Sequence, residues 1–358
     1  AQRYPDVYDG YVIGAPLTSY FSLRPVWNNQ NQIGVVPPTL YTSTANMTIG
    51  HAVHDPAALI PNSLASDPTA YRNYGVAKGD TYRKTLYAQC DGLDGLEDGI
   101  IADPEKCTFI YSEAGLKAAL PMCASDVDAS NCFTNEQVKT LVRINNPPVD
   151  SRGAKLTVAL LGGGSVPIVP VYPSFGGRAW DYFKYMAFNP PPGPSWNWMS
   201  FNFDIDPARV AASGIMDILD ATDPNLWGVK YHGAKIIMWH GGADPVIPTL
   251  QSLEYYKGVK TRMGDVSDFF RYYLVPGVDH CGGGPGCYDR NNYNMWVKPL
   301  MDWVESGKAP GAIIGSQVDN TGKVLRTRPQ CPYPLIAKPI KTPLAGAEVN
   351  DAANFVCQ

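Results

Sequence analysis

The segment from Lys235 to Val275 constrains the fold of this chain most strongly. It opens with a short apolar run, KIIMW, that leads into His-Gly-Gly, the pattern of a buried strand entering a loop. Residues 248–262 then carry apolar side chains at helical spacing, with a proline at the first position and a glycine just past the end. Phe269–Val275 is a second β-branched and aromatic run, stopped by Pro-Gly. Strand, helix and strand of these lengths form a βαβ unit, so the sequence predicts an α/β fold with a parallel sheet.

An aspartate follows the first of these strands and a histidine follows the second: Asp244 and His280. Open α/β sheets place their ligands just beyond the carboxyl ends of the strands. An acid followed by a histidine is the second half of a Ser…Asp…His triad, in which the imidazole takes the serine proton and the carboxylate fixes the imidazole's tautomer. The pattern alone leaves a second interpretation open, in which Asp244 caps the helix and His280 is an ordinary loop residue.

Two motifs around these residues narrow the choice: HGGADPVIP at 240–248 and LVPGVDHCGGGPG at 274–286. They resemble the C-terminal catalytic segment of the tannase and feruloyl esterase family. The resemblance implies an α/β-hydrolase core with a large inserted lid, and a secreted serine esterase that cleaves esters of phenolic acids. An esterase that releases terephthalate from its glycol monoester is a relative. In this family the cysteine beside the catalytic histidine, here Cys281, is disulfide-bonded to a cysteine beside the nucleophilic serine.

The nucleophile that such a triad needs is missing from these 358 residues, because neither the family signature Gly-Cys-Ser-x-Gly-Gly nor any Gly-x-Ser-x-Gly occurs. Residues 1–16 resemble the family segment that directly follows this signature. Residues 2–5 would end the helix after the serine, and Tyr11–Ile13 would be the next buried strand. The resemblance therefore implies that the chain is the larger, C-terminal part of an enzyme. Its serine would lie in another segment or chain, linked through Cys281.

A length of 358 residues is large for one compact core, so a second domain or a large insertion is expected. By resemblance, residues 1–25 and 226–358 are expected to form the hydrolase core, and residues 26–225 the lid domain. A rigid loop at 189–198 is rich in proline and tryptophan. It either lines a pocket for an aromatic acid or, more simply, contributes ordinary packing of tryptophans.

The predicted lid contains an acidic, glycine-rich run, CDGLDGLEDGI, at 90–100. Oxygen ligands at this density suit Ca²⁺, although the spacing of the acids is not that of an EF-hand. For Asp-Gly repeats alone, a solvated turn is the simpler interpretation. The run resembles the family's calcium loop, however, and we expect a structural calcium that holds the lid's fold. The resemblance implies five ligands: the side chains of Asp91, Asp94 and Asp98 and the carbonyl groups of Leu96 and Ile100.

Eight cysteines, mostly at short paired spacings, indicate an oxidising compartment. Three pairs are expected within the chain: Cys90 with Cys107, Cys123 with Cys132, and Cys331 with Cys357. The third pair would anchor the C-terminal tail. Cys281 then needs a partner in the serine-bearing segment, and Cys287 is left over, either as a free thiol or as a second link.

The net charge is −4, charged residues make up 17% of the chain, and there is no basic run, so nucleic acid is not an expected partner. No apolar stretch reaches membrane-spanning length, so no membrane association is expected. Together with the cysteines, this favours a secreted protein, extracellular or periplasmic. His240 is expected to pack at the end of its strand. His51 and His54 lack a third ligand, so zinc is not expected there.

The sequence therefore predicts a serine carboxylic-ester hydrolase of the feruloyl esterase type, which acts on a small phenolic ester through an acyl-enzyme. Tannase activity on gallate esters and hydrolysis of a terephthalate monoester are the alternatives, because all three reactions need a pocket for an aromatic acid. A function of another class also remains open: a calcium-stabilised binding protein whose catalytic part is gone. The pairing of Cys281 distinguishes the enzyme from the binding protein.

Overall fold

A computed structural model of the protein describes most of the chain. The described residues are 1–18, 23–32, 68–129, 131–162, 180–244, 247–289, 291–292, 294–344 and 346–358. The histidines at 51 and 54 lie outside these ranges, so the expectation that they bind no zinc stays a prediction.

A parallel three-stranded sheet forms the centre of the molecule, with β1 (Gly10–Gly14), β2 (Lys235–Gly241) and β3 (Phe270–Val275) in the order β1-β2-β3. Helix α10 (Thr249–Met263) joins β2 to β3, so the predicted βαβ unit and the α/β class are confirmed. Strand β2 continues past the apolar run, because His240 and Gly241 still pair with Leu274 and Val275.

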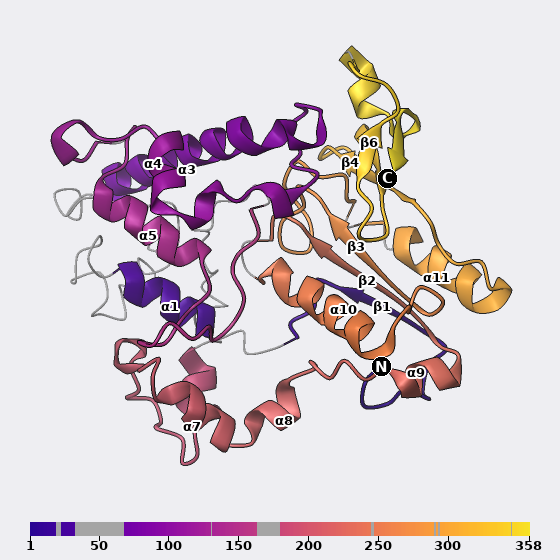
Figure 1. Ribbon diagram of the computed structural model, residues 1–358, viewed down its shortest axis with the longest axis horizontal. Helices are drawn as coiled ribbons and strands as arrows, with labels where there is room; N and C mark the ends of the chain where they lie inside the picture. The colour runs from indigo at the N-terminus through magenta and orange to yellow at the C-terminus, as the bar shows by residue number, and fades with distance from the viewer. Residues whose placement is uncertain are drawn as a thin grey trace.

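The two faces of the sheet are covered by different helices (Figure 1). Alternate side chains of β2 point to opposite faces. Ile236 and Met238 pack against α10, whereas Ile237 and Trp239 pack against α11 (Asn294–Ser306). Trp239 stacks on Trp296 of α11, with ring centroids 5.7 Å apart and an angle of 2° between the planes. The sheet is thus held between two helices, and its strand ends are fixed on a rigid scaffold.

Two short antiparallel hairpins follow the sheet, one formed by β4 (Ile313–Val318) and β5 (Val324–Gln330), the other by β6 (Ala337–Pro339) and β7 (Phe355–Cys357). The disulfide Cys331–Cys357 links the end of β5 to β7. An isolated bridge between Tyr273 and Pro332 attaches this region to β3.

The described α-helices between β1 and β2 lie mainly to the left of the sheet in Figure 1, and α9 lies near the sheet. They are α1 (Leu23–Gln32), α3 (Pro68–Cys90), α4 (Glu113–Ala119), α5 (Asn135–Asn145), α7 (Asp206–Ala212), α8 (Ile215–Leu219) and α9 (Trp227–His232). A capping box between Thr134 and Gln137 starts α5. The disulfides Cys90–Cys107 and Cys123–Cys132 lie in this region, as expected.

The tryptophans of the loop at 189–198 join an aromatic cluster with side chains of α1. Trp196 stacks on Phe183 at 5.0 Å, and Trp198 stacks on Trp180 at 6.0 Å. Both tryptophans are half-buried against these neighbours. This arrangement favours the simpler interpretation of the loop, ordinary packing of tryptophans.

The expectation of a helix end at residues 2–5 is wrong, because Arg3 forms a bend, Pro5 starts a turn and none of these residues is helical. The side chain of Gln2 donates to the carbonyl of Ala221 (2.8 Å), and that of Arg3 donates to the carbonyls of Asp217 and Asp220 (2.9 and 3.1 Å). These side-chain hydrogen bonds hold the segment against α8 and the loop that follows it.

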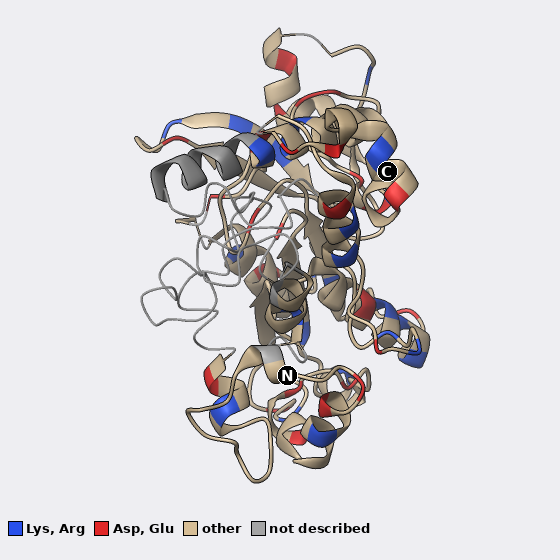
Figure 2. Ribbon diagram, turned by 90° about the vertical axis from the view of Figure 1, so that its left-hand side faces the viewer, with Lys and Arg blue, Asp and Glu red and all other residues tan. Residues whose placement is uncertain are grey.

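No helix in the described part of the chain is long and apolar enough to cross a membrane. Basic and acidic positions are interspersed along the described ribbon (Figure 2), in keeping with the small net charge of −4.

Candidate active site

Asp244 and His280 lie side by side beyond the carboxyl ends of β2 and β3. The Nδ1 atom of His280 is 2.9 Å from Oδ2 of Asp244. The Asp244 side chain is fully buried, whereas the His280 side chain is 23% exposed. The other carboxylate oxygen of Asp244 accepts a hydrogen bond from the amide of Ile247 (2.9 Å), in the turn that leads into α10. Asp244 does not cap α10, whose N-cap is Pro248 without a side-chain cap hydrogen bond. Its carboxylate binds the Ile247 amide before the helix and the imidazole of His280.

A glycine lets the two loops approach this closely. A Cβ atom on Gly241 would lie 2.3 Å from the carbonyl oxygen of Val278 and 2.6 Å from that of Asp279, both far inside van der Waals contact. The amide of Ala243 donates to the Val278 carbonyl (3.0 Å). The glycines of the HGGAD motif thus allow the Asp244 loop to pack directly on the His280 loop.

Cys281 has a strained backbone beside the histidine. Its φ is 56°, in the left-handed region that L residues with a side chain adopt at a cost. Its exposed thiol lies 3.9 Å from Nε2 of His280, the nitrogen that Asp244 does not bind. In a Ser-His-Asp triad this nitrogen takes the serine proton. Nε2 of His280 therefore faces an exposed cysteine without a disulfide partner in the described residues.

The pair holds opposite charges. Burial raises the pKa of Asp244, but hydrogen bonds from His240 and His280 outweigh it and lower this pKa to about 2. Burial lowers the pKa of His280, but its hydrogen bonds to Asp244 and Cys281 raise this pKa to about 10. The carboxylate therefore stays ionised and stabilises the imidazolium, which is the task of a triad acid.

Sequence reasoning missed the participation of His240. It was expected to pack at its strand end, and it is fully buried there. Its Nε2 atom also lies 3.2 Å from Oδ2 of Asp244, and its Nδ1 atom lies 2.6 Å from the hydroxyl of Ser252. The four-residue spacing of His240 and Asp244 across a Gly-Gly turn was the available signal.

The predicted calcium loop is a short, partly buried segment with acidic side chains turned inward. Asp91–Asp94 form a 3₁₀ turn, and Oδ1 of Asp91 is buried without a hydrogen-bond partner among the described residues. Burial raises the pKa of Asp91 and raises that of Asp94 to about 6. An orphaned carboxylate oxygen and carboxylates disfavoured by burial fit a hard cation such as Ca²⁺ in their chemistry.

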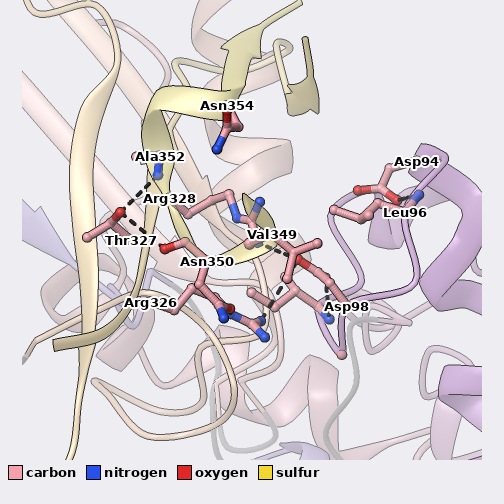
Figure 3. Close-up of polar contacts among 12 residues, drawn as sticks. Asp94, Leu96, Asp98, Arg326, Thr327, Arg328, Val349, Asn350, Ala352 and Asn354 are labelled. Atoms are coloured by element: carbon pink, nitrogen blue, oxygen red, sulfur yellow. Dashed lines mark hydrogen bonds and ion pairs between the residues drawn. The ribbon is translucent and has the colours of Figure 1, made fainter. Parts of the chain in front are cut away.

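Asp98 has a different neighbour (Figure 3). It is paired with the guanidinium of Arg328, and Arg326 lies 3.9 Å away. Asp94, in contrast, accepts from the amide of Leu96 at 3.0 Å, away from the arginines. Across the residues that the structure describes, no three His, Cys, Asp or Glu side chains gather as a metal site. The calcium ligands Asp91, Asp94, Leu96, Asp98 and Ile100 therefore stay a prediction.

The loop packs on the C-terminal region. Leu96 contacts the apolar cluster around the Cys331–Cys357 disulfide. A cavity of about 310 Å³ lies next to this contact, with Asp94, Glu105 and Arg328 in its lining. The loop thus joins the helical region to the hairpins beside the sheet.

Comparisons with known proteins identify relatives of this chain. A family model described as tannase and feruloyl esterase matches residues 76–165 and 191–358. Mono(2-hydroxyethyl) terephthalate hydrolase of Piscinibacter sakaiensis is 29% identical over the whole of this chain and 60% of its own length. Feruloyl esterase B of Aspergillus niger is 26% identical over 93% of this chain and 59% of its own length.

Solved structures show the same fold. The crystal structure of feruloyl esterase B from Aspergillus oryzae superposes with a TM-score of 0.75 and 22% identity, covering 100% of this chain and 65% of that one. Tannin acyl hydrolase from Aspergillus niger gives a TM-score of 0.68 and 18% identity, covering 100% of this chain and 61% of that one. The chain spans about three fifths of the length of the curated relatives that it matches. Its fold is of the α/β-hydrolase type, and the chain belongs to the tannase and feruloyl esterase family.

Proposed function

We propose that this chain carries the acid and the base of a serine carboxylic-ester hydrolase that acts on esters of aromatic acids. The observation that supports it best is the contact of 2.9 Å between His280 Nδ1 and the buried carboxylate of Asp244, at the carboxyl ends of neighbouring parallel strands. Family membership supplies the reaction class. Asp244 binds Nδ1 of His280, so Nε2 is the nitrogen that exchanges a proton with the serine.

In this reaction, His280 takes the proton of a serine hydroxyl as the serine oxygen attacks the ester carbonyl, and then passes it to the leaving alcohol. The acyl-enzyme is hydrolysed by a water that His280 deprotonates in turn. Asp244 stays ionised throughout and stabilises the imidazolium formed in each half of the cycle.

The serine comes from outside these 358 residues, in a segment or chain linked through Cys281. Three observations support this: the sequence lacks a nucleophile motif, the chain matches only part of its relatives' length, and Nε2 of His280 lies beside an exposed thiol. Strand β1 also lies at an edge of the described three-stranded sheet. A neighbouring strand that ends in the serine would extend the sheet there.

A feruloyl ester is the proposed substrate, with gallate esters and a terephthalate monoester as alternatives. Relatives named for the first and the third are similarly distant from this chain, at 26% and 29% identity. The protein would work outside the cytosol, because its three disulfides need an oxidising compartment. A calcium ion, held by the carboxylates of Asp91, Asp94 and Asp98 and the carbonyls of Leu96 and Ile100, would stabilise the lid formed by residues 26–225.

Substitution of the two residues tests the proposal. In the complete protein, His280→Ala should abolish hydrolysis of methyl ferulate, because no other group removes the serine proton. Asp244→Asn should lower kcat by roughly 10⁴-fold, because the amide favours the wrong tautomer of His280. His232→Ala is the matched control and should leave kcat unchanged. This histidine lies away from the site, with its Nε2 atom 3.4 Å from Oδ1 of Asp9. Methyl gallate and mono(2-hydroxyethyl) terephthalate, assayed in parallel, rank the three substrates. Full turnover by His280→Ala would refute the assignment.

A further inference from the structure

We propose that His240 is a positioning residue of this site: its imidazole holds the carboxylate of Asp244 in line with His280. The proposal rests on the function proposed above. His240 is the sixth residue of β2, and Asp244 lies in the loop that follows this strand. His240 and Ser252 are completely buried, and Asp244 is 6% exposed.

The donors and acceptors fit together in one pattern. An ionised carboxylate only accepts hydrogen bonds, so the imidazole nitrogens that face Oδ2 of Asp244 are both donors. These are Nδ1 of His280 at 2.9 Å and Nε2 of His240 at 3.2 Å. The other ring nitrogen of His240, Nδ1, lies 2.6 Å from the Ser252 hydroxyl. Ser252 thus orients the ring so that its Nε2 faces Asp244.

The contacts fix the plane of the carboxylate from both sides. The amide of Ile247 binds Oδ1 (2.9 Å), and His240 binds Oδ2. Because a free Asp carboxylate rotates broadly about χ2, these two donors determine where Oδ2 presents its remaining lone pair. That direction is toward His280. His240 on the strand, Asp244 in the loop and Ser252 on α10 therefore couple the rigid βαβ unit to the site.

Packing alone does not require a histidine here. On the same face of β2, Ile236 and Met238 fill the space against α10 with apolar side chains. A buried imidazole is costly unless both of its nitrogens are hydrogen-bonded, and both are engaged in this structure. The histidine at this position therefore serves to bind Asp244, which an apolar residue of similar size could not do.

NMR of the isolated protein with labelled histidines, kept without reductant, tests the proposal. It measures the pKa of His280, which a change in packing alone should not alter. His240→Leu should lower the pKa of His280 by at least about one unit, because the Asp244 carboxylate can then rotate out of line with His280 and weaken the contact that raises this pKa. It should also remove the low-field resonance of the His280 Nδ1 proton. His240→Gln keeps an N–H donor near Oδ2 and should preserve both signals. Met238→Leu, on the same strand face, is the packing control and should change neither.

Ester hydrolysis by the complete protein provides the second arm. His240→Leu should lower kcat by roughly 10- to 100-fold with KM unchanged, because one hydrogen bond to a charged group is lost at the reacting centre. His240→Gln should recover most of this rate. If His240→Leu does not fold, Ser252→Ala should produce the same changes at smaller size, because His240 then loses the hydrogen bond that orients its ring.

The outcomes separate this proposal from the one on which it rests. An unchanged His280 pKa and unchanged kcat in a folded His240→Leu variant would overturn the role of His240 and leave the esterase assignment standing. A wild-type protein that hydrolyses no aromatic ester, but whose His280 pKa falls in His240→Leu, would overturn the esterase assignment and support the role of His240.

Discussion

His280 is the proposed base of this site, and its protonation makes the stability of the protein depend on pH. Its charge is held by the buried carboxylate of Asp244, 2.9 Å away. The neighbouring thiol of Cys281 also contributes to its raised pKa. In a complete enzyme with Cys281 in a disulfide, that thiol would be absent, and the histidine would lose its proton more readily.

A dependence of stability on alkaline pH follows from this pKa. The pKa of His280 rises from its ordinary value of 6.5 to about 10 on folding. The protonated histidine therefore stabilises the folded state fully below about pH 6.5, and this contribution is lost as the pH rises through 10. The pKa of Asp244 is lowered to about 2, so its contribution is present at neutral pH and is lost only as the pH falls toward 2.

Thermal unfolding of the protein and of His280→Gln between pH 6 and 10.5 measures the effect. The melting temperature of the wild type should fall more steeply than that of the variant above about pH 7. His232→Gln serves as the control for general alkaline destabilisation. Parallel curves for the wild type and His280→Gln would show that His280 has no raised pKa.

At the scale of elements, the contact between the predicted calcium loop and β5 is the second feature of interest. The Arg328 guanidinium is paired with Asp98, donates to the carbonyl of Val349 (2.8 Å) and lies 3.5 Å from the ring centroid of Phe355. The side chains of Arg328 and Asp98 are 7% and 3% exposed. One side chain thus joins the loop after α3, the strand β5 and the C-terminal segment.

Arg328→Met should destabilise the protein by about 3 kcal/mol, because it removes the nearest cation from the buried carboxylate of Asp98 and leaves only Arg326, 3.9 Å away. Chemical denaturation measures this change. The matched control is Arg83→Met, which breaks the exposed pair with Asp80 and should cost no more than about 1 kcal/mol. Equal effects of the two substitutions would mean that the Asp98–Arg328 pair does not anchor the loop.

Calcium binding is tested on the same loop. If Asp91, Asp94 and Asp98 hold Ca²⁺, millimolar calcium should raise the melting temperature of the chelator-treated protein, since a ligand that binds only the folded state stabilises it. Asp94→Ala should abolish this rise. Glu97→Ala, an exposed acid in the same loop and outside the proposed ligand set, should keep it. Identical melting curves of the wild type with calcium and with chelator would exclude the site.

At the scale of the whole molecule, the unpaired cysteines separate the two classes of function. Cys281 is exposed and Cys287 is buried, and burial raises the pKa of the Cys287 thiol to about 11. Only the first is therefore accessible for a link to another segment or chain. Cys287 packs beside β4, where its carbonyl accepts from the side chain of Gln330 (3.0 Å).

Intact mass of the isolated protein, measured without reductant and then with it, tests this link. A two-chain esterase should lose mass on reduction and release a smaller peptide that contains Gly-Cys-Ser. Peptide mapping should place the bond at Cys281. The same mass in both conditions, equal to that of this chain, would exclude a disulfide-linked serine peptide and favour the binding protein.

The local sequence was sufficient for the features that depend on neighbouring residues. The alternation and spacing of apolar side chains predicted β2, α10 and β3 to within two residues at each end, and the short cysteine spacings predicted two disulfides. The HGGAD and DHCGGG motifs predicted which strand ends carry Asp244 and His280. These predictions succeed because the spacing of apolar side chains and the positions of glycine and proline within a short segment determine its strands, helix and turns.

The tertiary structure alone decided which polar groups meet. Asp98 and Arg328 are 230 positions apart and pair only because the loop after α3 packs on β5. The side chains of Gln2 and Arg3 donate to carbonyls more than 200 positions away in the sequence. His240 looked like a packing residue, and only the burial of β2 under α10 gives it Asp244 and Ser252 as partners. A buried polar group must find partners wherever the fold brings them, and sequence spacing does not contain that information.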